Sequence, residues 1–389
     1  MGRFRFIGFS IKFDGIDSLR LFTKMAGLYF HIPFCLQKCG YCNFYSIPTE
    51  KIPFSFVQSL ETEIWLRSSL FEKCPVHTLF FGGGTPSLLP PQWIERICNQ
   101  VSRYYSLEKL LEITLECNPK TGNAHWMKAY WQLGINRISL GVQSFCDESL
   151  RILGRLHTAQ EAIETFFMLR KAGFTNVNLD LMFGIPNETL ARFQKTLKTA
   201  LSLSPEHISL YALTLHAHTP LTSKIKKEKW ILPNEDLLCT MYEWAVSELE
   251  SAGYEHYEIS NFAKPGFRCK HNEGYWNGIP YLGFGPSAHS FTGARRFWNL
   301  PNVRKYITAL HNSKLPPERE EYLNPEQQRL EAIALGLRKK EGIPLDWIQG
   351  KNFIIENLLN RQLATLSENR LALTTKGFLL ADAVALALT

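Results

Sequence analysis

The 389-residue sequence has no apolar run long enough to cross a membrane. Its longest apolar stretch, residues 378–388, is interrupted by Asp382 and is far shorter than the ~20 residues that a membrane-spanning helix needs. Near the N-terminus, residues 6–11 are mostly apolar but end at Lys12, whereas a secretory signal needs ~7–15 apolar residues. We therefore expect a cytoplasmic protein without a membrane span. Peripheral contact with a membrane acceptor is compatible with this expectation.

The sequence also lacks a concentration of charge of one sign. It has 43 Lys and Arg against 36 Asp and Glu, a net charge of +7. The densest basic run, residues 224–229, is typical of a solvated helix face. Because nucleic-acid-binding proteins gather basic residues on one face, we expect no nucleic-acid partner.

Disulfides are not expected either, although the chain has nine cysteines. Thiols stay reduced in the cytosol, so cysteines there indicate metal binding or catalysis more often than cross-links. Glycine and proline, at 25 and 20 residues, are too few for a low-complexity chain. A hydrophobic content of 45% predicts an ordinary folded protein.

Short β-branched or apolar runs alternate with amphipathic helical patterns from residue 28 onwards. This alternation predicts βα units and a parallel sheet, an α/β fold. Six units are too few for a closed eight-stranded barrel, so we expect a partial (βα)6 barrel with its ligands at the carboxyl ends of the strands. The predicted strands are residues 28–32, 78–81, 111–116, 137–142, 177–183 and 207–213.

Four segments are predicted along the chain. Met25 resembles a true start, so residues 1–24 are interpreted as a leader that is disordered or not native. Residues 25–252 form the barrel, and residues 253–318 form an aromatic- and glycine-rich extension. Residues 319–389 are predicted to form a small accessory α+β domain that resembles a winged helix.

The strongest motif is a cysteine cluster directly after the first predicted strand. Cys35, Cys39 and Cys42 form C-x3-C-x2-C, so three thiolates within eight residues can hold a soft metal centre such as an iron–sulfur cluster. In a four-iron cluster, three protein ligands leave one iron open for a small molecule. The alternative is a zinc site with a distant fourth ligand.

Polar and glycine-rich motifs end other predicted strands. FFGGGTP contains Gly83 and Gly84, which permit close approach of a ligand, and Thr85, which adds a hydroxyl. Further polar side chains near the expected cleft need polar partners, and a bound ligand or an internal salt bridge would supply them. They are Glu116, Gln143 and Asp180.

Together these motifs resemble the radical S-adenosylmethionine (SAM) superfamily. The segment YFHIPFCLQKCGYCNF is similar to the branch that contains oxygen-independent coproporphyrinogen III oxidases and HemW-type haem chaperones, and the resemblance covers residues 27–380. It implies a [4Fe-4S] cluster on Cys35, Cys39 and Cys42, whose open iron chelates SAM. An electron donor then reduces the cluster, which cleaves SAM to methionine and a deoxyadenosyl radical.

The same resemblance implies the residues that contact SAM; whether one or two molecules bind stays open. Contacts of a first SAM correspond to Tyr29, Gly83, Gly84, Thr85 and Glu116. Contacts of a second SAM, as in the oxidases, correspond to Tyr41, Gln143, Arg155 and Asp180.

Two features separate the branches. The oxidases carry a further cysteine two positions after the third, where this chain has Phe44. The segment HNEGYW, with His271, Tyr275 and Trp276, resembles the signature of the haem chaperones. This resemblance implies that His271 is an axial haem ligand and that Tyr275 and Trp276 form an aromatic wall.

We expect the HNEGYW segment to cover the open barrel mouth and bring haem towards the cluster. Arg268 and Lys270 would meet the haem propionates. His289 and Cys269 are alternative ligands, and the HAH pair, His216 and His218, is weaker.

The sequence thus predicts a haem chaperone that binds a [4Fe-4S] cluster, SAM and haem and delivers haem to an unknown acceptor protein. One alternative is oxygen-independent decarboxylation of coproporphyrinogen III. The other, a structural zinc or nucleic-acid-binding protein, is disfavoured by the absence of a basic stripe.

Overall fold

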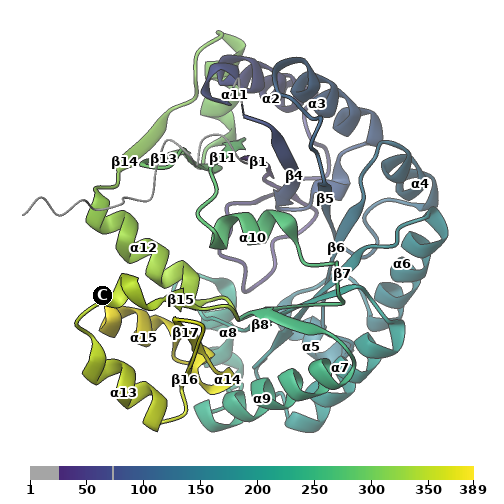
Figure 1. The fold of residues 1–389 in the computed structure, drawn as a ribbon. Helices are drawn as coiled ribbons and strands as arrows, with labels where there is room; N and C mark the ends of the chain where they lie inside the picture. The colour runs from purple at the N-terminus through teal and green to yellow at the C-terminus, as the bar shows by residue number, and fades with distance from the viewer. Residues whose placement is uncertain (1–25, 72–73) are drawn as a thin grey trace, which may run out of the picture.

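The computed structural model describes residues 26–71 and 74–389, so the predicted leader, residues 1–24, and Met25 lie outside the described residues. A twelve-stranded mixed sheet curls into an incomplete ring (Figure 1). Its strand order is β14-β13-β12-β11-β1-β4-β5-β6-β7-β8-β10-β9.

Seven neighbouring strands of this sheet are parallel, and they form the barrel wall. The six predicted strands are confirmed, with small shifts at their ends. The seventh, β11, comes after residue 252 and pairs in parallel with β1, which the six-strand prediction did not include. The bounds are β1 (Ala26–Ile32), β4 (Val76–Gly83), β5 (Glu112–Cys117), β6 (Arg137–Gln143), β7 (Val177–Phe183), β8 (His207–Ala212) and β11 (Tyr281–Phe284).

Helices between the parallel strands cover the outside of the ring (Figure 1). Local signals fix their ends: α6, for example, begins with a capping box between Thr158 and Glu161 and ends at Gly173 in a left-handed conformation. The bounds are α2 (Phe54–Leu66), α3 (Pro91–Tyr104), α4 (Ala124–Gln132), α5 (Asp147–Leu153), α6 (Ala159–Ala172), α7 (Leu190–Leu203), α8 (Pro220–Glu228) and α9 (Glu235–Ser251). No helix among the described residues is both long and apolar enough to span a membrane.

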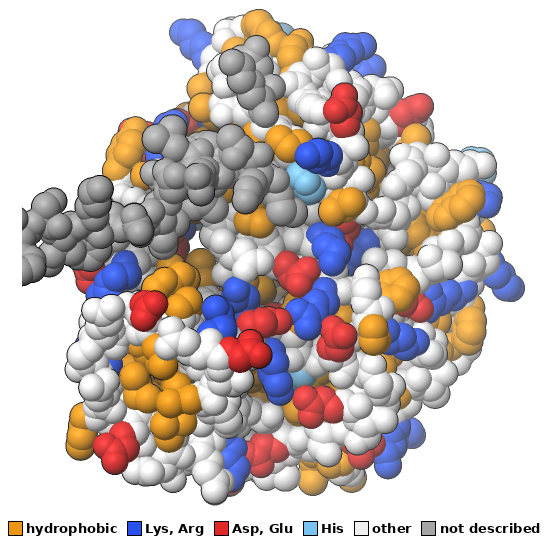
Figure 2. All heavy atoms as spheres, viewed as in Figure 1, with side chains coloured by type: hydrophobic (Ala, Val, Ile, Leu, Met, Phe, Trp, Pro, Cys, Tyr) orange, Lys and Arg blue, Asp and Glu red, His pale blue; other side chains and the backbone are white. Residues whose placement is uncertain are grey.

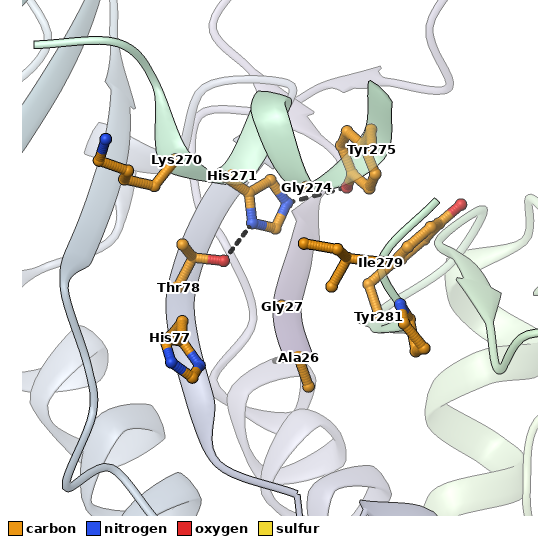
Figure 3. Close-up of a pocket in the computed structure, with 11 residues that line it drawn as sticks. Ala26, Gly27, His77, Thr78, Lys270, His271, Gly274, Tyr275, Ile279 and Tyr281 are labelled. Carbon is orange, nitrogen blue, oxygen red and sulfur yellow. Dashed lines mark hydrogen bonds between the residues drawn. The ribbon is translucent and has the colours of Figure 1, made fainter. Parts of the chain in front are cut away.

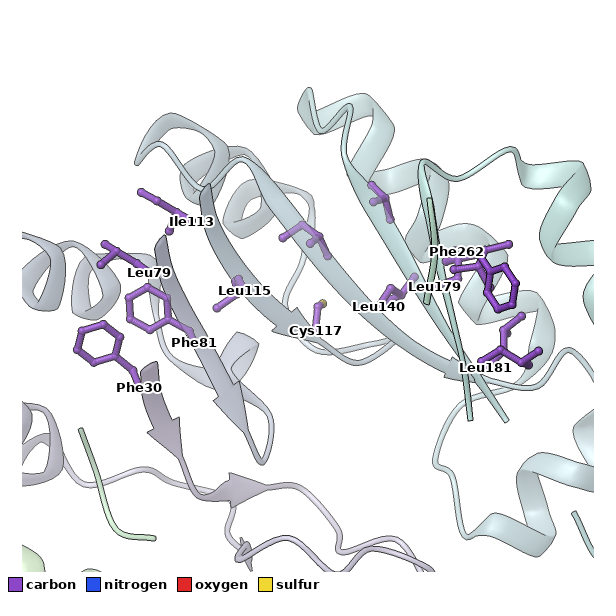
Figure 4. Close-up of a cluster of buried hydrophobic side chains, with 14 of the residues drawn as sticks. Phe30, Leu79, Phe81, Ile113, Leu115, Cys117, Leu140, Leu179, Leu181 and Phe262 are labelled. Carbon is purple, nitrogen blue, oxygen red and sulfur yellow. The ribbon is translucent and has the colours of Figure 1, made fainter. Parts of the chain in front are cut away.

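The side chains of the parallel strands alternate between the two faces of the wall. Apolar side chains point outwards and are buried under the helices, as Phe30, Leu79, Leu115 and Leu140 show (Figure 4). Many side chains on the inner face are polar, among them Thr114, Ser139 and Ser209. The strand period of two therefore separates an apolar shell from a polar interior.

Antiparallel strands extend both edges of the parallel wall. The bounds are β9 (Glu255–Glu258) and β10 (Asn261–Ala263) beside β8, and β12 (His289–Phe291), β13 (Arg295–Asn299) and β14 (Glu318–Tyr322) beside β11. Two further helices are α10 (Lys270–Trp276), which lies across the centre of the ring, and α11 (Val303–His311), which packs on α2 (Figure 1).

A C-terminal unit fills the gap between the two edges of the ring (Figure 1). Its small sheet has the order β15-β17-β16, and α14 packs against α9 of the barrel. The elements are α12 (Pro325–Leu337), β15 (Ile343–Pro344), α13 (Asn352–Asn360), β16 (Ala364–Ser367), β17 (Arg370–Leu373), α14 (Thr375–Phe378) and α15 (Ala381–Leu388). The winged-helix interpretation and the domain boundaries stay predictions.

A buried carboxylate joins α2 to the added strands. Glu63 accepts hydrogen bonds from Arg67 Nε at 2.9 Å, Gly285 N at 2.8 Å, and both Asn299 Nδ2 and Tyr306 Oη at 2.7 Å. These donors are the residue that caps the C-terminus of α2, the residue directly after β11, and residues of β13 and α11. Because Glu63 is fully buried, its charge needs all of them.

We expect Glu63→Gln to lower the free energy of unfolding by about 2–4 kcal/mol, because an amide nitrogen would then face donors and Arg67 would lose a buried counter-charge. Urea denaturation measures this loss. Glu61→Gln is the matched control on the same helix: Glu61 pairs with exposed Arg96, so its loss costs less than about 1 kcal/mol. Equal losses in both variants would contradict the role given to Glu63.

Candidate functional site

The three cysteines lie together at the carboxyl end of β1. Cys35 belongs to the short strand β2 (Phe34–Cys35), which pairs with β3 (Ile47–Pro48), and Cys39 and Cys42 lie in the loop between them. All three thiols are half-buried and free of disulfides. Burial raises the pKa of Cys35 and Cys42, and the nearby cysteines raise it further. The structure thus places the three predicted ligands close enough for their charges to affect one another's pKa.

The donors of this loop are the thiolates that an iron–sulfur cluster takes from a protein. Within the described residues, no three His, Cys, Asp or Glu side chains converge so that they could hold one ion. In a [4Fe-4S] cluster each thiolate binds a different iron, so the sulfurs surround the cluster without meeting at one point. Three soft donors on one loop therefore fit the cluster that the resemblance implies.

The glycine-rich turn after β4 is fastened to the cysteine loop. Gly84 N donates to Ile32 O at 2.9 Å, and Thr85 N donates to Phe34 O at 2.8 Å. A side chain at Gly83 would collide with His31, since its Cβ would lie 2.5 Å from the ring, and its φ of 108° is also unfavourable for other residues. Thr85 Oγ1 donates to Cys35 Sγ at 3.5 Å. This predicted SAM-binding turn therefore lies directly beside the cysteines.

Arg155 and Asn118 link the cysteine loop to two further strand ends. Arg155 Nη1 donates to Cys39 Sγ at 3.4 Å, and Nη2 donates to Gly141 O and Asn118 Oδ1, each at 2.6 Å. Asn118 Nδ2 in turn donates to Thr85 Oγ1 at 2.9 Å. The buried Nε of Arg155 has no partner among the described residues, which leaves one donor for a ligand.

Gln143 and Tyr41 lie next to this network. Gln143 ends β6 at a register shift and has a φ of 68°, unusual for a residue with a side chain. Its Nε2 and Arg155 Nη2 lie 3.2 and 3.5 Å from the place where a Cβ of Gly141 would be. Burial raises the pKa of Tyr41, while the Arg155 charge beside it lowers that pKa. Tyr41, Gln143 and Arg155 therefore lie together, and Asp180 pairs in register with Gly141 on the neighbouring strand.

Glu116 faces the barrel interior below the glycine turn. Its Oε2 accepts a hydrogen bond from Gly83 N at 2.9 Å, and no described residue bonds to its other oxygen. Burial and the nearby Asp180 raise the pKa of Glu116 to about 8. A cationic ligand placed here would favour the ionised form, as expected for a residue that meets a SAM ammonium or hydroxyl.

Asp180 and Tyr29 are already bonded within the wall. Asp180 accepts from Ser139 Oγ at 3.1 Å and from Asn178 Nδ2 at 2.8 Å, although burial still raises its pKa. The Tyr29 hydroxyl lies 2.9 Å from His31 Nδ1. Both line the interior, but these two side chains have fewer free hydrogen-bonding groups than Glu116 or Arg155, and their contact with SAM stays a prediction.

The HNEGYW segment forms α10, and its predicted position is wrong. Lys270 N and His271 N donate to Glu112, the first residue of β5, at 2.9 and 3.2 Å. His271 Nδ1 lies 2.8 Å from Thr78 Oγ1, near the start of β4. Helix α10 therefore closes the amino-terminal end of the parallel strands, whereas the cysteines lie at the carboxyl end.

His271 does not offer a free nitrogen to a metal (Figure 3). Its Nδ1 is bonded to Thr78 and its Nε2 lies 2.9 Å from the Tyr275 hydroxyl. Burial and the charge of Arg137 lower its pKa to about 3. The cavity beside it, about 20 Å³, has room for roughly one water molecule and none for a porphyrin. Both ring nitrogens of His271 are thus bonded within the protein in this structure, and its role as an axial haem ligand stays a prediction.

The cations expected to meet haem propionates are also engaged. Arg268 pairs with Glu255 and Glu341, each at 2.9 Å, and Lys270 lies 3.5 Å from Glu273. Figure 2 shows the same mixture of basic and acidic side chains over α10 at the centre of this face. Trp276 packs beneath the guanidinium of Arg338, at 4.8 Å from the ring centre. The charged side chains around this segment are thus paired at the base of the barrel.

Two residues that hold the site together, Asn118 and His31, were not predicted from the sequence. Asn118 follows Glu116 by two residues, so its place just after a predicted strand was an available signal. His31 Nε2 lies 2.9 Å from Tyr45 O, and burial lowers its pKa to about 4. Both residues join segments that are distant in sequence, which a spacing motif does not reveal.

Comparison with known proteins agrees with this geometry. A model of the radical SAM superfamily matches residues 29–200. The crystal structure of the Escherichia coli coproporphyrinogen III oxidase HemN, a radical SAM enzyme, superposes with a TM-score of 0.82 at 23% identity, covering 95% of this chain and 92% of that one. This likeness shows a shared fold.

Fold and site therefore define a protein of the radical SAM class. The heme chaperone HemW of Lactococcus lactis is 35% identical over 94% of this chain and 97% of its own length. HemW of Bacillus subtilis is 34% identical over 92% of this chain and 98% of its own length. The chain belongs to the HemW family of the radical SAM superfamily.

Replacing Glu116 by Gln tests the electrostatics of the site. Because the pKa of Glu116 is raised from 4.5 to about 8 on folding, the folded protein binds more protons than the unfolded chain between these values, and its stability falls as pH rises. As pH rises through this window, we expect the free energy of unfolding of wild type to fall by on the order of 1 kcal/mol per pH unit relative to that of Glu116→Gln. Urea unfolding of both apoproteins at several pH values measures this change. A difference in free energy of unfolding that does not vary with pH would contradict the raised pKa of Glu116.

Proposed function

We propose that the protein is a haem chaperone that binds a [4Fe-4S] cluster, SAM and haem and transfers haem to an acceptor protein. The observation that carries this proposal is the three-cysteine loop, which lies beside Gly83, Thr85 and Arg155 in a chain similar to HemW proteins over nearly its whole length.

Cys35, Cys39 and Cys42 would hold the cluster. When bound, the cluster and SAM supply a site for reductive cleavage of the sulfonium. The chain's own residues position and enclose them: Thr85 and Arg155 donate hydrogen bonds to two of the sulfurs, and such donors stabilise thiolate ligands. Glu116 and the backbone at Gly83 and Gly84 would contact SAM.

Phe44 supports a chaperone rather than an oxidase. It occupies the position of the oxidases' additional cysteine, two residues after Cys42, and its side chain is 70% exposed. A phenyl ring neither binds iron nor donates a hydrogen atom as a thiol can. The edge of the cysteine loop is therefore apolar at the place where the oxidase branch has a reactive group.

We expect replacement of Cys35, Cys39 or Cys42 by Ala, one at a time, to remove most bound iron and sulfide, because two thiolates retain a cluster poorly. Iron and acid-labile sulfide analysis of anaerobically reconstituted protein measures the loss. Cys239→Ala on α9 is the matched control and should keep full content. Full iron and sulfide in all three loop variants would contradict the assignment.

The proposed function itself is tested on one anaerobic preparation. We expect the protein to bind haem, seen as a Soret band, and to give it up to an apo-haem protein such as apomyoglobin. We expect no decarboxylation when the reduced, SAM-loaded protein is given coproporphyrinogen III. Product formation without haem binding would instead establish the oxidase activity.

A further inference from the structure

A chain of hydrogen bonds runs from Arg155 to the sulfur of Cys35, and the side chain of Asn118 lies in the middle of it. Arg155 Nη2 donates to Asn118 Oδ1 at 2.6 Å, and Asn118 Nδ2 donates to Thr85 Oγ1 at 2.9 Å. Thr85 Oγ1 then donates to Cys35 Sγ at 3.5 Å. The chain therefore joins residues just beyond the carboxyl ends of β4 and β5 to the cysteine loop.

The chemistry of the four groups fixes the direction of every bond in this chain. A guanidinium has donors and no acceptor, so the atom of Asn118 that faces Arg155 must be the amide oxygen. The amide nitrogen then faces Thr85 and donates to its hydroxyl oxygen. Because a hydroxyl has one hydrogen and its oxygen already accepts from Asn118, that hydrogen is directed at Cys35 Sγ. The charge of Arg155 thus sets the orientation of the Thr85 hydroxyl through one amide.

The amide of Asn118 is also held by its surroundings. Asn118 N donates to Thr121 Oγ1 at 3.1 Å, and Thr121 N donates to Asn118 O at 3.1 Å, so a turn fixes the backbone. A Cβ at Gly141 would lie 2.7 Å from Asn118 Oδ1, so the glycine leaves the room that the amide needs. A substitution that keeps the size of the amide therefore leaves the turn in place and changes the hydrogen-bond chain.

The last bond of the chain reaches a residue that is proposed to bind the cluster. Burial raises the pKa of the Cys35 thiol, whereas the hydrogen bond from Thr85 lowers it, so this bond favours the thiolate. Hydrogen bonds to the sulfurs of an iron–sulfur cluster raise its reduction potential, because they stabilise the additional negative charge of the reduced state.

We propose that Asn118 is a positioning residue that orients the Thr85 hydroxyl towards Cys35 Sγ and thereby raises the reduction potential of the [4Fe-4S] cluster. This inference rests on the cluster binding in the proposed function. A carboxylate at position 118 would still accept from Arg155, but it would also accept from the Thr85 hydroxyl and turn its hydrogen away from the sulfur. The position therefore needs an amide, which accepts on one side and donates on the other.

The experiment is a redox titration of the reconstituted full-length protein, followed by the electron paramagnetic resonance signal of the reduced cluster. SAM is left out, which separates this effect from the proposed contact of Thr85 with SAM. We expect Asn118→Asp and Thr85→Val each to lower the midpoint potential, so that at the wild-type midpoint the ratio of reduced to oxidised cluster falls by about three- to tenfold. Thr85→Ser keeps the hydroxyl and should keep the wild-type ratio.

Two further variants separate the orientation of the hydroxyl from the added negative charge. In Asn118→Asp the hydroxyl already points away from the sulfur, so adding Thr85→Val should change the ratio by less than about twofold. Asn123→Asp places the same charge at the N-cap of α4, where Asp caps as well as Asn, and should leave the ratio unchanged.

A wild-type potential in Asn118→Asp, fully additive shifts in the double variant, or an equal shift in Asn123→Asp would overturn this inference and leave the proposed function standing. If Asn118→Asp assembles no cluster, Asn118→Ala takes its place. Without the amide the hydroxyl turns freely, so the potential should lie between those of wild type and Thr85→Val, and a wild-type value would overturn the inference. A wild-type protein that assembles no cluster would overturn the cluster binding in the proposed function itself.

Discussion

The buried charge of Arg137 is the constraint around which the barrel interior is arranged. Its side chain is almost fully buried at the start of β6, and an isolated charge there would be very costly. The carboxylates of Glu112 and Asp180 lie close enough to favour its ionised form. The same positive charge lowers the pKa of His271 and so helps to keep that imidazole neutral. Helix α10 completes this arrangement, because its first backbone N–H groups donate to Glu112.

This arrangement makes the two ends of the barrel chemically different. At the base, the first backbone N–H groups of α10 and both ring nitrogens of His271 are hydrogen-bonded, and surface ions are paired around Arg268. At the mouth, the half-buried cysteines, the unbonded Nε of Arg155 and a free carboxylate oxygen of Glu116 still need partners. Thiols, a guanidinium nitrogen and a carboxylate oxygen that lie close together at the strand ends offer a ligand several polar contacts, as expected of the end where ligands bind.

The sequence allowed prediction of the wall and of the residues at its carboxyl edge, because parallel strands separated by helices bring their ends together whatever the intervening lengths. That rule placed Cys35, Glu116 and Gln143 in one region, whereas Arg155 was implied only by the family resemblance. The rule failed for β11, a strand of only four residues, YLGF, that pairs with β1 across more than 240 residues. It also failed for His271, because a motif gives the spacing of side chains along a helix and not the edge of the barrel against which that helix packs.

The shape of the barrel mouth depends on two glycines whose backbones lie close against β1, one on each side of the strand. Gly285, with a φ of 101°, lies against His31 O, while Gly83 lies against the ring of the same histidine. His31 is itself held between the Tyr29 hydroxyl and Tyr45 O, so its position is fixed by two hydrogen bonds. Any side chain at either glycine would displace it. The two glycine-rich segments, far apart in sequence, are therefore shaped by one buried neutral imidazole, which sets how near the rim strand β12 comes to the cysteine loop.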